Sequence, residues 1–186
     1  MKRLIDLMIC LMLFSLLLFP MVLIAVLIKL TSKGPILYWS KRVGIDGLIF
    51  YMPKFRTMRV NTPELATHLL SNPSNFLTPI GGFLRQNSLD EIPQLLSIFK
   101  GDMSLVGPRP ALFNQEDLIE LRRNNGLDKL TPGLTGWAQV NGRDELSIDE
   151  KIQMDLEYKN KKSFYFDSKI LWLTFLKVLK RKGISH

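Results

Sequence analysis

Two adjacent carboxylates, Asp90 and Glu91, are the residues of this sequence best suited to chemistry. Neighbouring carboxylates repel each other, so one of them can hold a proton near neutral pH unless cations lie close by. A carboxylate can attack phosphorus to form an acyl-phosphate, and two carboxylates can hold a magnesium ion that also contacts substrate phosphates. The pattern alone favours a structural role, because Ser88-x-x-Glu91 is a capping box and acids are common in the first turn of a helix. Either way the pair is expected at a helix N-terminus, where phosphate also binds.

Cations are available near these carboxylates. Arg109 lies within a Gly-Pro-Arg-Pro turn, residues 107–110, whose prolines reduce the entropy lost when the loop is ordered. A guanidinium also suits bidentate contact with phosphate oxygens. The alternative for each cation is a solvated basic surface. The other candidates are Lys54 and Arg56 beside a predicted strand, Arg85, and Lys100.

The scarce residue types exclude several kinds of chemistry. Cys10 is the single cysteine, so neither a disulfide within the chain nor a zinc site made of cysteines can form. The two histidines are His68, in a polar stretch, and the terminal His186, so a Ser-His-Asp triad would have to depend on His68. The formal net charge of +8 indicates an anionic partner, which could be nucleic acid, a membrane surface or a phosphorylated substrate. Scattered lysines and arginines without interleaved aromatic residues disfavour nucleic acid.

A long apolar segment opens the chain and must position whatever follows. Residues 7–28 carry no charge and are numerous enough for a helix to cross the hydrocarbon core of a bilayer. Pro20 lies near the middle, where it removes a backbone hydrogen bond and favours a kink. Basic residues flank both ends, so charge gives no orientation. Two interpretations therefore stand: a spanning helix, and a re-entrant helix that bends at Pro20 and returns to the same face.

The rest of the sequence is typical of a small domain with mixed secondary structure. Short strands are predicted at 36–39 and 48–52 around a turn, and a loop at 61–78 with a short helix at 64–70. Further helices are predicted at 88–99, 114–123 and 147–160, with loops at 101–110 and a loop and strand at 131–142. Residues 167–182 combine an apolar face with a basic one, as in a helix at a membrane interface or a core helix with a solvated end.

The stretch SLDEIPQLLSIFKGDMSLVGPRP, residues 88–110, strongly resembles the bacterial sugar transferases, the monotopic phosphoglycosyl transferases. Members of this family start glycan assembly on a polyprenyl carrier. Three further segments are similar to the same family: KFRTM at 54–58, TPGLTGWAQVNGR at 131–143, and Asp155 with Tyr158 in MDLEY. The resemblance covers nearly the whole chain.

The resemblance implies a mixed α/β, helix-rich fold. Residues 1–33 would form a re-entrant, Pro-kinked membrane helix, and residues 34–186 a small cytoplasmic catalytic domain with interfacial amphipathic helices. The expected location is the bacterial inner (cytoplasmic) membrane, with the catalytic domain facing the cytoplasm. Family members often have serine before the membrane proline, whereas Phe19 stands here, and a serine hydroxyl would favour the bend. The sequence is similar to a minimal version of the family, without additional transmembrane helices.

The resemblance also implies a reaction. Asp90 would attack the β-phosphate of a UDP-sugar, release UMP, and pass the covalently held phosphosugar to polyprenyl (undecaprenyl) phosphate. Mg²⁺ would assist at Asp90 and Glu91; the donor could be a UDP-linked acetamido sugar or a hexose. No nucleic acid partner is expected, and a homo-oligomer stays open. The alternatives are a membrane-anchored glycosyltransferase that releases UDP and a single-pass anchored basic binding protein. The implied substrate-binding residues are Lys54, Arg56, Arg85, Arg109 and Gln139.

Overall fold

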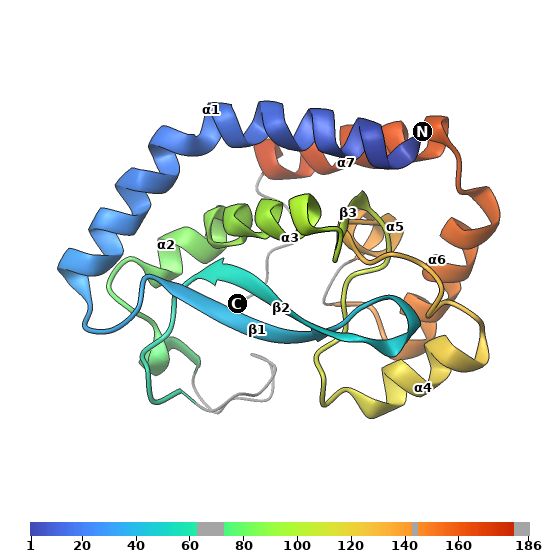
Figure 1. Cartoon of the computed structure of the whole chain (residues 1–186). Coiled ribbons are helices and arrows are strands. Elements are labelled where there is room, and N and C mark those ends of the chain that lie inside the picture. Colours follow the sequence, from blue (N-terminus) through green and yellow to red (C-terminus); the bar gives the residue numbers. More distant parts are fainter. Residues whose placement is uncertain (63–72, 143–144, 181–186) are drawn as a thin grey trace.

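The computed structural model describes residues 1–62, 73–142 and 145–180 and has a helix-rich, mixed α/β architecture. The long helix α1 (Lys2–Thr31) lies along one side of a domain made of short helices and two small sheets (Figure 1). The short helix expected at 64–70 lies outside the described residues, and so do residues 181 and 182 at the end of the predicted amphipathic helix.

Helix α1 is long and apolar enough to cross a membrane. Pro20 lies inside it, and the helix bends part-way along its length (Figure 1). Both of its ends are bonded to the domain: Arg3 donates hydrogen bonds to the carbonyls of Ile98 and Phe99, and Arg56 donates to Ser32 just beyond the helix. Much of its remaining surface is apolar and exposed, including Leu4, Leu16, Phe19 and Leu30.

Two sheets of two strands each form the rest of the scaffold. Strands β1 (Leu37–Val43) and β2 (Ile49–Phe55) are antiparallel, with Leu37 opposite Phe55 and Val43 opposite Ile49. Both strands are longer than the sequence pattern predicted. Strands β3 (Ser104–Val106) and β4 (Gly133–Thr135) are parallel, and β3 lies inside a segment expected to be a loop.

The prediction of one continuous helix at 88–99 is wrong. It is divided into the 3₁₀ helix η4 (Leu89–Gln94) and helix α3 (Leu95–Lys100). Ser88 adopts a left-handed conformation (φ 54°), and its side chain does not cap the helix. Pro93 lacks the N–H that an α-helix would use and lies inside η4. The capping box forms elsewhere, between Ser147 and Glu150 at the start of α6 (Ile148–Lys161).

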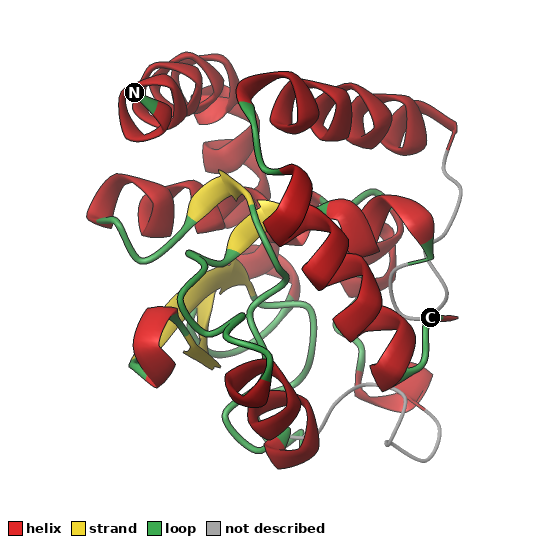
Figure 2. Ribbon diagram, turned by 90° about the vertical axis from the view of Figure 1, so that its right-hand side faces the viewer, coloured by secondary structure: helices red, strands yellow, loops and turns green. Residues whose placement is uncertain are grey.

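The remaining helices complete the domain around these sheets. Helix α7 (Phe164–Lys180) lies on the same side of the molecule as α1, as both views show (Figures 1 and 2). It buries Phe166 and Ile170 while exposing Trp172 and Phe175, so one face packs in the core and another presents aromatic residues. Residues 131–142 contain a short helix that the sequence pattern did not predict. The other helices are η1 (Ile45–Gly47), η3 (Pro73–Phe76), α2 (Gly81–Gln86), α4 (Glu116–Asn124) and α5 (Trp137–Asn141).

Candidate active site

The Asp90–Glu91 pair lies on η4, which packs against strand β2. Asp90 is 8% exposed. One carboxylate oxygen of Glu91 accepts a hydrogen bond from the Lys54 ammonium at 2.8 Å and another from the Arg109 guanidinium at 3.2 Å. The structure therefore brings together a strand lysine, a loop arginine and the two carboxylates, although 37 positions separate Lys54 from Glu91.

Burial governs the protonation of this site. Loss of hydration raises the pKa of the Asp90 carboxyl, and the charge of Glu91 adds to the increase. The cations Lys54, Arg85 and Arg109 act in the opposite direction on that pKa. Burial also lowers the pKa of the Lys54 amine, against the attraction of Glu91. The result is a poorly hydrated carboxylate whose charge depends on three surrounding cations.

Arg109 is presented by a loop with little freedom to move. The loop follows β3, and its Gly107 packs directly on the segment that leads into β4. A Cβ atom at Gly107 would lie 2.3 Å from the Thr131 carbonyl oxygen and 2.9 Å from the Gly133 nitrogen, so no other residue fits without a shift of the backbone. The Gly133 amide donates to the Pro108 carbonyl at 2.8 Å. The glycines in both motifs therefore bring the two backbones together.

Side chains bind two further backbone carbonyls, one in this loop and one at the end of β3. Arg122 on α4 donates to the Arg109 carbonyl at 2.8 Å and forms an ion pair with the buried Asp155 of α6 at 2.7 Å. Tyr158, one turn further along α6, donates to the carbonyl of Val106 at 3.1 Å. Burial raises the pKa of Asp155, while Arg122 acts to lower it. These buried contacts fix the backbone that carries the Arg109 guanidinium.

Sequence reasoning assigned no role to Arg122, and it noted Asp155 and Tyr158 only as part of a family motif. The available signal was their spacing: residues three apart on a helix lie on one face. From one face of α6, Asp155 therefore pairs with Arg122, while Tyr158 bonds to the Val106 carbonyl.

The other predicted substrate residues lie in different surroundings. Arg85 on α2 is close enough to influence Asp90 electrostatically. Arg56 is buried and donates hydrogen bonds to Ser32, just beyond the end of α1. With Lys33 and Arg59 it also lines a cavity of about 620 Å³. Its role in substrate binding stays a prediction, alongside this structural role.

Gln139 lies on α5, next to the loop that carries Arg109. A Cβ atom placed at Gly136 would approach both the Gly107 carbonyl oxygen and the Gln139 side-chain oxygen, so these two groups are neighbours. Both polar atoms of the Gln139 amide are buried without a hydrogen-bond partner among the described residues. Its expected contact with substrate stays a prediction.

The donor set at Asp90–Glu91 is compatible with magnesium. No group of three or more His, Cys, Asp or Glu side chains gathers anywhere in the described part of the chain. Mg²⁺, however, commonly uses one or two protein carboxylates and completes its coordination with water and substrate phosphates. Two adjacent hard oxygen ligands fit that pattern.

The comparisons with known proteins agree with these motifs. The family model described as bacterial sugar transferase matches residues 1–181. The chain is 40% identical to "Uncharacterized sugar transferase EpsL" of Bacillus subtilis, covering 86% of this chain and 77% of that protein. It is 40% identical to the UDP-glucose:undecaprenyl-phosphate glucose-1-phosphate transferase of Xanthomonas campestris pv. campestris, covering 89% of this chain and 36% of that protein. It is 36% identical to the undecaprenyl-phosphate galactose phosphotransferase of Salmonella typhimurium, covering 81% and 34%. The chain belongs to the bacterial sugar transferase family.

Proposed function

We propose that this protein transfers a sugar-1-phosphate from a UDP-sugar to polyprenyl phosphate at the bacterial cytoplasmic membrane. The observation that carries the proposal is the Asp90–Glu91 pair, with Asp90 buried and with Lys54, Arg85 and Arg109 around it. Relatives of this chain are named for such transfers, with glucose or galactose as the sugar. The reaction would be a membrane step in the assembly of a bacterial polysaccharide or glycoprotein glycan.

Two substitutions at the same phosphorus account for the reaction. In the first, a carboxylate oxygen of Asp90 attacks the β-phosphorus, the bond to the bridging oxygen breaks, and UMP leaves with the electron pair. In the second, an oxygen of polyprenyl phosphate attacks the aspartyl-phosphosugar, and the Asp90 carboxylate leaves. The product is a polyprenyl diphosphate sugar. The attacking groups are already anions, so neither step needs a histidine base.

The cations have two tasks in this mechanism. Lys54 and Arg109 hold the Glu91 carboxylate, and together with Arg85 they offset the charge that the UDP diphosphate brings to the site. The low hydration of Asp90 makes its carboxylate more reactive once it is ionised. A Mg²⁺ ion at Asp90 and Glu91 would supply further neutralisation of the diphosphate when bound.

The arrangement of α1 supports a re-entrant membrane helix. Arg3 ties its first turn to α3, and Arg56 ties the residue after its last turn to the end of β2. A helix held at both ends by one polar domain does not place its ends on opposite faces of a bilayer. Its exposed apolar residues would then enter one leaflet, with the catalytic domain on the cytoplasmic side, where UDP-sugars are available.

Nucleotide release tests the reaction directly. The full chain, purified in detergent, is incubated with Mg²⁺, polyprenyl phosphate and a panel of UDP-sugars, and the nucleotide released is identified. We expect UMP from the wild type and a loss of at least about 10³-fold in the Asp90→Asn variant. Asp117→Asn, which changes an exposed carboxylate on α4, is the matched control and should behave as wild type.

The products separate the alternatives. UDP in place of UMP would identify a glycosyltransferase, and an Asp90→Asn variant with full activity would remove the proposed nucleophile. With a radiolabelled donor and no acceptor, label should remain covalently attached to the wild type and be absent from Asp90→Asn. Absence of labelled protein in the wild type would argue for direct transfer without an intermediate.

A further inference from the structure

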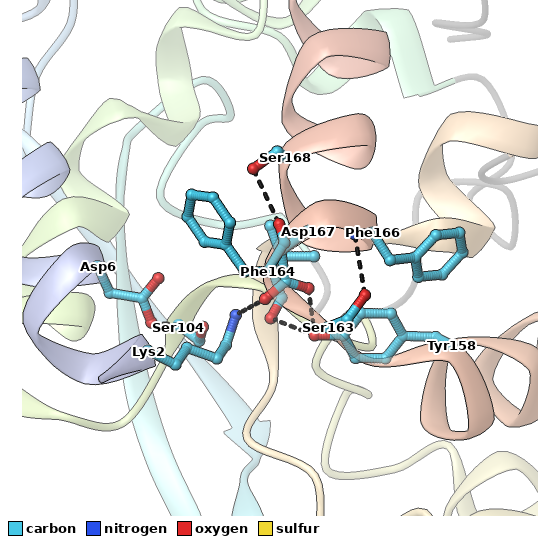
Figure 3. A network of polar contacts seen from close by, with 10 residues as sticks. Lys2, Asp6, Ser104, Tyr158, Ser163, Phe164, Phe166, Asp167 and Ser168 are labelled. Atoms are coloured by element: carbon cyan, nitrogen blue, oxygen red, sulfur yellow. Dashed lines mark hydrogen bonds and ion pairs between the residues drawn. The ribbon is translucent and has the colours of Figure 1, made fainter.

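A chain of polar contacts runs from the first residues of α1 through Asp167 to Tyr158 on α6 (Figure 3). Tyr158 extends it to Val106, which directly precedes the loop that carries Arg109. The Lys2 ammonium pairs with one carboxylate oxygen of Asp167, in the first turn of α7, at 2.5 Å. The Tyr158 hydroxyl lies 2.9 Å from the other Asp167 oxygen and 3.1 Å from the Val106 carbonyl oxygen. The Tyr158 hydroxyl is the donor toward both acceptors, the Asp167 carboxylate and the Val106 carbonyl, and so links the two.

The contact between Tyr158 and Val106 is protected from water. Tyr158 is 2% exposed and Val106 is 1% exposed, so a bond lost between them is not replaced by bulk water. Burial, with the charge and hydrogen bond of Asp167, raises the pKa of Tyr158, so the hydroxyl keeps its proton. A second contact runs beside the first, because Ser104 on β3 donates to the buried Asp6 of α1 at 2.7 Å.

Val106 transmits its position to Arg109 over a short and constrained path. Gly107 follows it and packs against the Thr131 carbonyl, leaving no room for a Cβ. The Gly107 amide is also bonded to the Thr135 carbonyl at 2.9 Å. Gly107 therefore couples the position of Val106 to the start of the loop that carries Arg109.

We propose that Tyr158 is a positioning residue that sets the place of the Arg109 guanidinium relative to the apolar helices α1 and α7. Through Tyr158, the position of these two helices on the domain determines how the Arg109 guanidinium contacts the diphosphate of the UDP-sugar. The kinetic part of this inference depends on the proposed function; its structural part does not.

A double-mutant cycle tests whether Tyr158 acts through Arg109. We expect Tyr158→Phe to lower kcat/KM for the UDP-sugar about tenfold, since it removes only the shared hydroxyl. In an Arg109→Lys background the same change should cost less than about twofold, because the guanidinium that it positions is already gone. The KM for polyprenyl phosphate should be unchanged. Tyr165→Phe, at an exposed site on α7, is the control.

Equal costs of Tyr158→Phe in both backgrounds would overturn the proposal, since a merely stabilising tyrosine acts independently of Arg109. An increase only in the KM for polyprenyl phosphate would overturn it as well. Asp167→Asn is a second variant should Tyr158→Phe fold poorly, because it keeps the side-chain shape and removes the charge that orients both Lys2 and the hydroxyl.

Hydrogen exchange gives a readout that does not require activity. Amides in residues 104–110 should exchange faster in Tyr158→Phe and, to a smaller extent, in Lys2→Gln, while Tyr165→Phe matches the wild type. Unchanged exchange in Tyr158→Phe would overturn the positioning role. Unchanged exchange in Lys2→Gln would overturn the link to α1. A wild type that turns over no UDP-sugar would count against the proposed function, and this comparison would still decide the inference.

Discussion

The two carboxylates of the candidate active site differ in their surroundings. Glu91 is paired with Lys54 and Arg109. Asp90 is buried, and the loss of hydration is the largest influence on its pKa. A carboxylate in ion pairs is a weak nucleophile because its negative charge is neutralised by the cations. A poorly hydrated carboxylate is more reactive, because it has fewer water molecules to lose when it attacks phosphorus. The assignment of Asp90 as nucleophile therefore agrees with its environment.

The pH dependence of the reaction should follow the ionisation of Asp90. Because burial raises its pKa, the acidic limb of the kcat/KM profile should lie above the range of an ordinary carboxyl, with activity rising as the proton is lost. Arg85 lowers this pKa, so Arg85→Gln should move the limb to higher pH. The measurement is the initial rate of UMP release between about pH 5 and 8.

The control for this shift is Arg123→Gln, which removes an exposed arginine from α4. It changes the net charge by the same amount and should leave the limb in place. A limb that stays fixed in Arg85→Gln, or that moves equally in both variants, would show that Arg85 does not act on the ionisation of Asp90.

Among individual residues, the sequence pattern predicted several side chains that the structure places together. Asp90, Glu91, Lys54 and Arg109 were all predicted for the site, and the structure brings them together. The contact between Arg122 and Asp155 was not foreseen, because 33 positions separate them and it arises from the packing of α4 on α6. Such pairs depend on tertiary packing, which no local spacing encodes.

The loop between β3 and α4 shows how whole elements position a single guanidinium. Glycine is required at position 107 because backbone atoms of Thr131 and Gly133 occupy the space that a Cβ atom would need. Gly107→Ala should therefore displace the loop, lower Tm by several degrees and reduce kcat/KM for the UDP-sugar by at least about tenfold. Thermal melting and UMP release measure the two effects on the same preparation.

Gly82→Ala is the matched control for this substitution. A Cβ at Gly82 would meet the nearest side-chain atom at 3.7 Å, an ordinary contact, and the residue lies inside helix α2. Alanine there should leave Tm unchanged or raise it slightly, because alanine favours helix over glycine. Equal effects of the two substitutions would contradict the close approach of the two backbones at Gly107.

Two physical causes account for the elements that the sequence pattern misjudged. Strand β3 and helix α5 have three and five residues, which is too short for a periodic pattern to emerge. The apparent helix start at Ser88 failed because its backbone is left-handed there and Glu91 is bound by Lys54 and Arg109 instead. The Glu91 carboxylate, which would accept the backbone hydrogen bond in a capping box, instead forms ion pairs with residues distant in the sequence.

For the molecule as a whole, the central question is how α1 meets the membrane. A straight helix of its length would extend about 45 Å, enough to cross a bilayer. Yet both ends are hydrogen-bonded to the same domain, through Arg3 and Arg56, and the helix that contains Pro20 is bent (Figure 1). Apolar length, Pro20 and the basic flanks together left spanning and re-entrant helices equally open; the contacts at the two ends favour re-entry.

Single-cysteine labelling distinguishes these two arrangements. Cys10 is the chain's one cysteine and is replaced by alanine; Leu4→Cys or Leu30→Cys then places a thiol at an exposed position near either end of α1. With a re-entrant helix, a membrane-impermeant maleimide added to intact cells should label neither variant, and both should react once the membrane is permeabilised. A spanning helix would expose Leu4→Cys to the reagent outside the cell while Leu30→Cys stayed protected. That asymmetry would require Arg3 to leave its partners on α3, so it would overturn the re-entrant arrangement and the seating of α1 on the catalytic domain together.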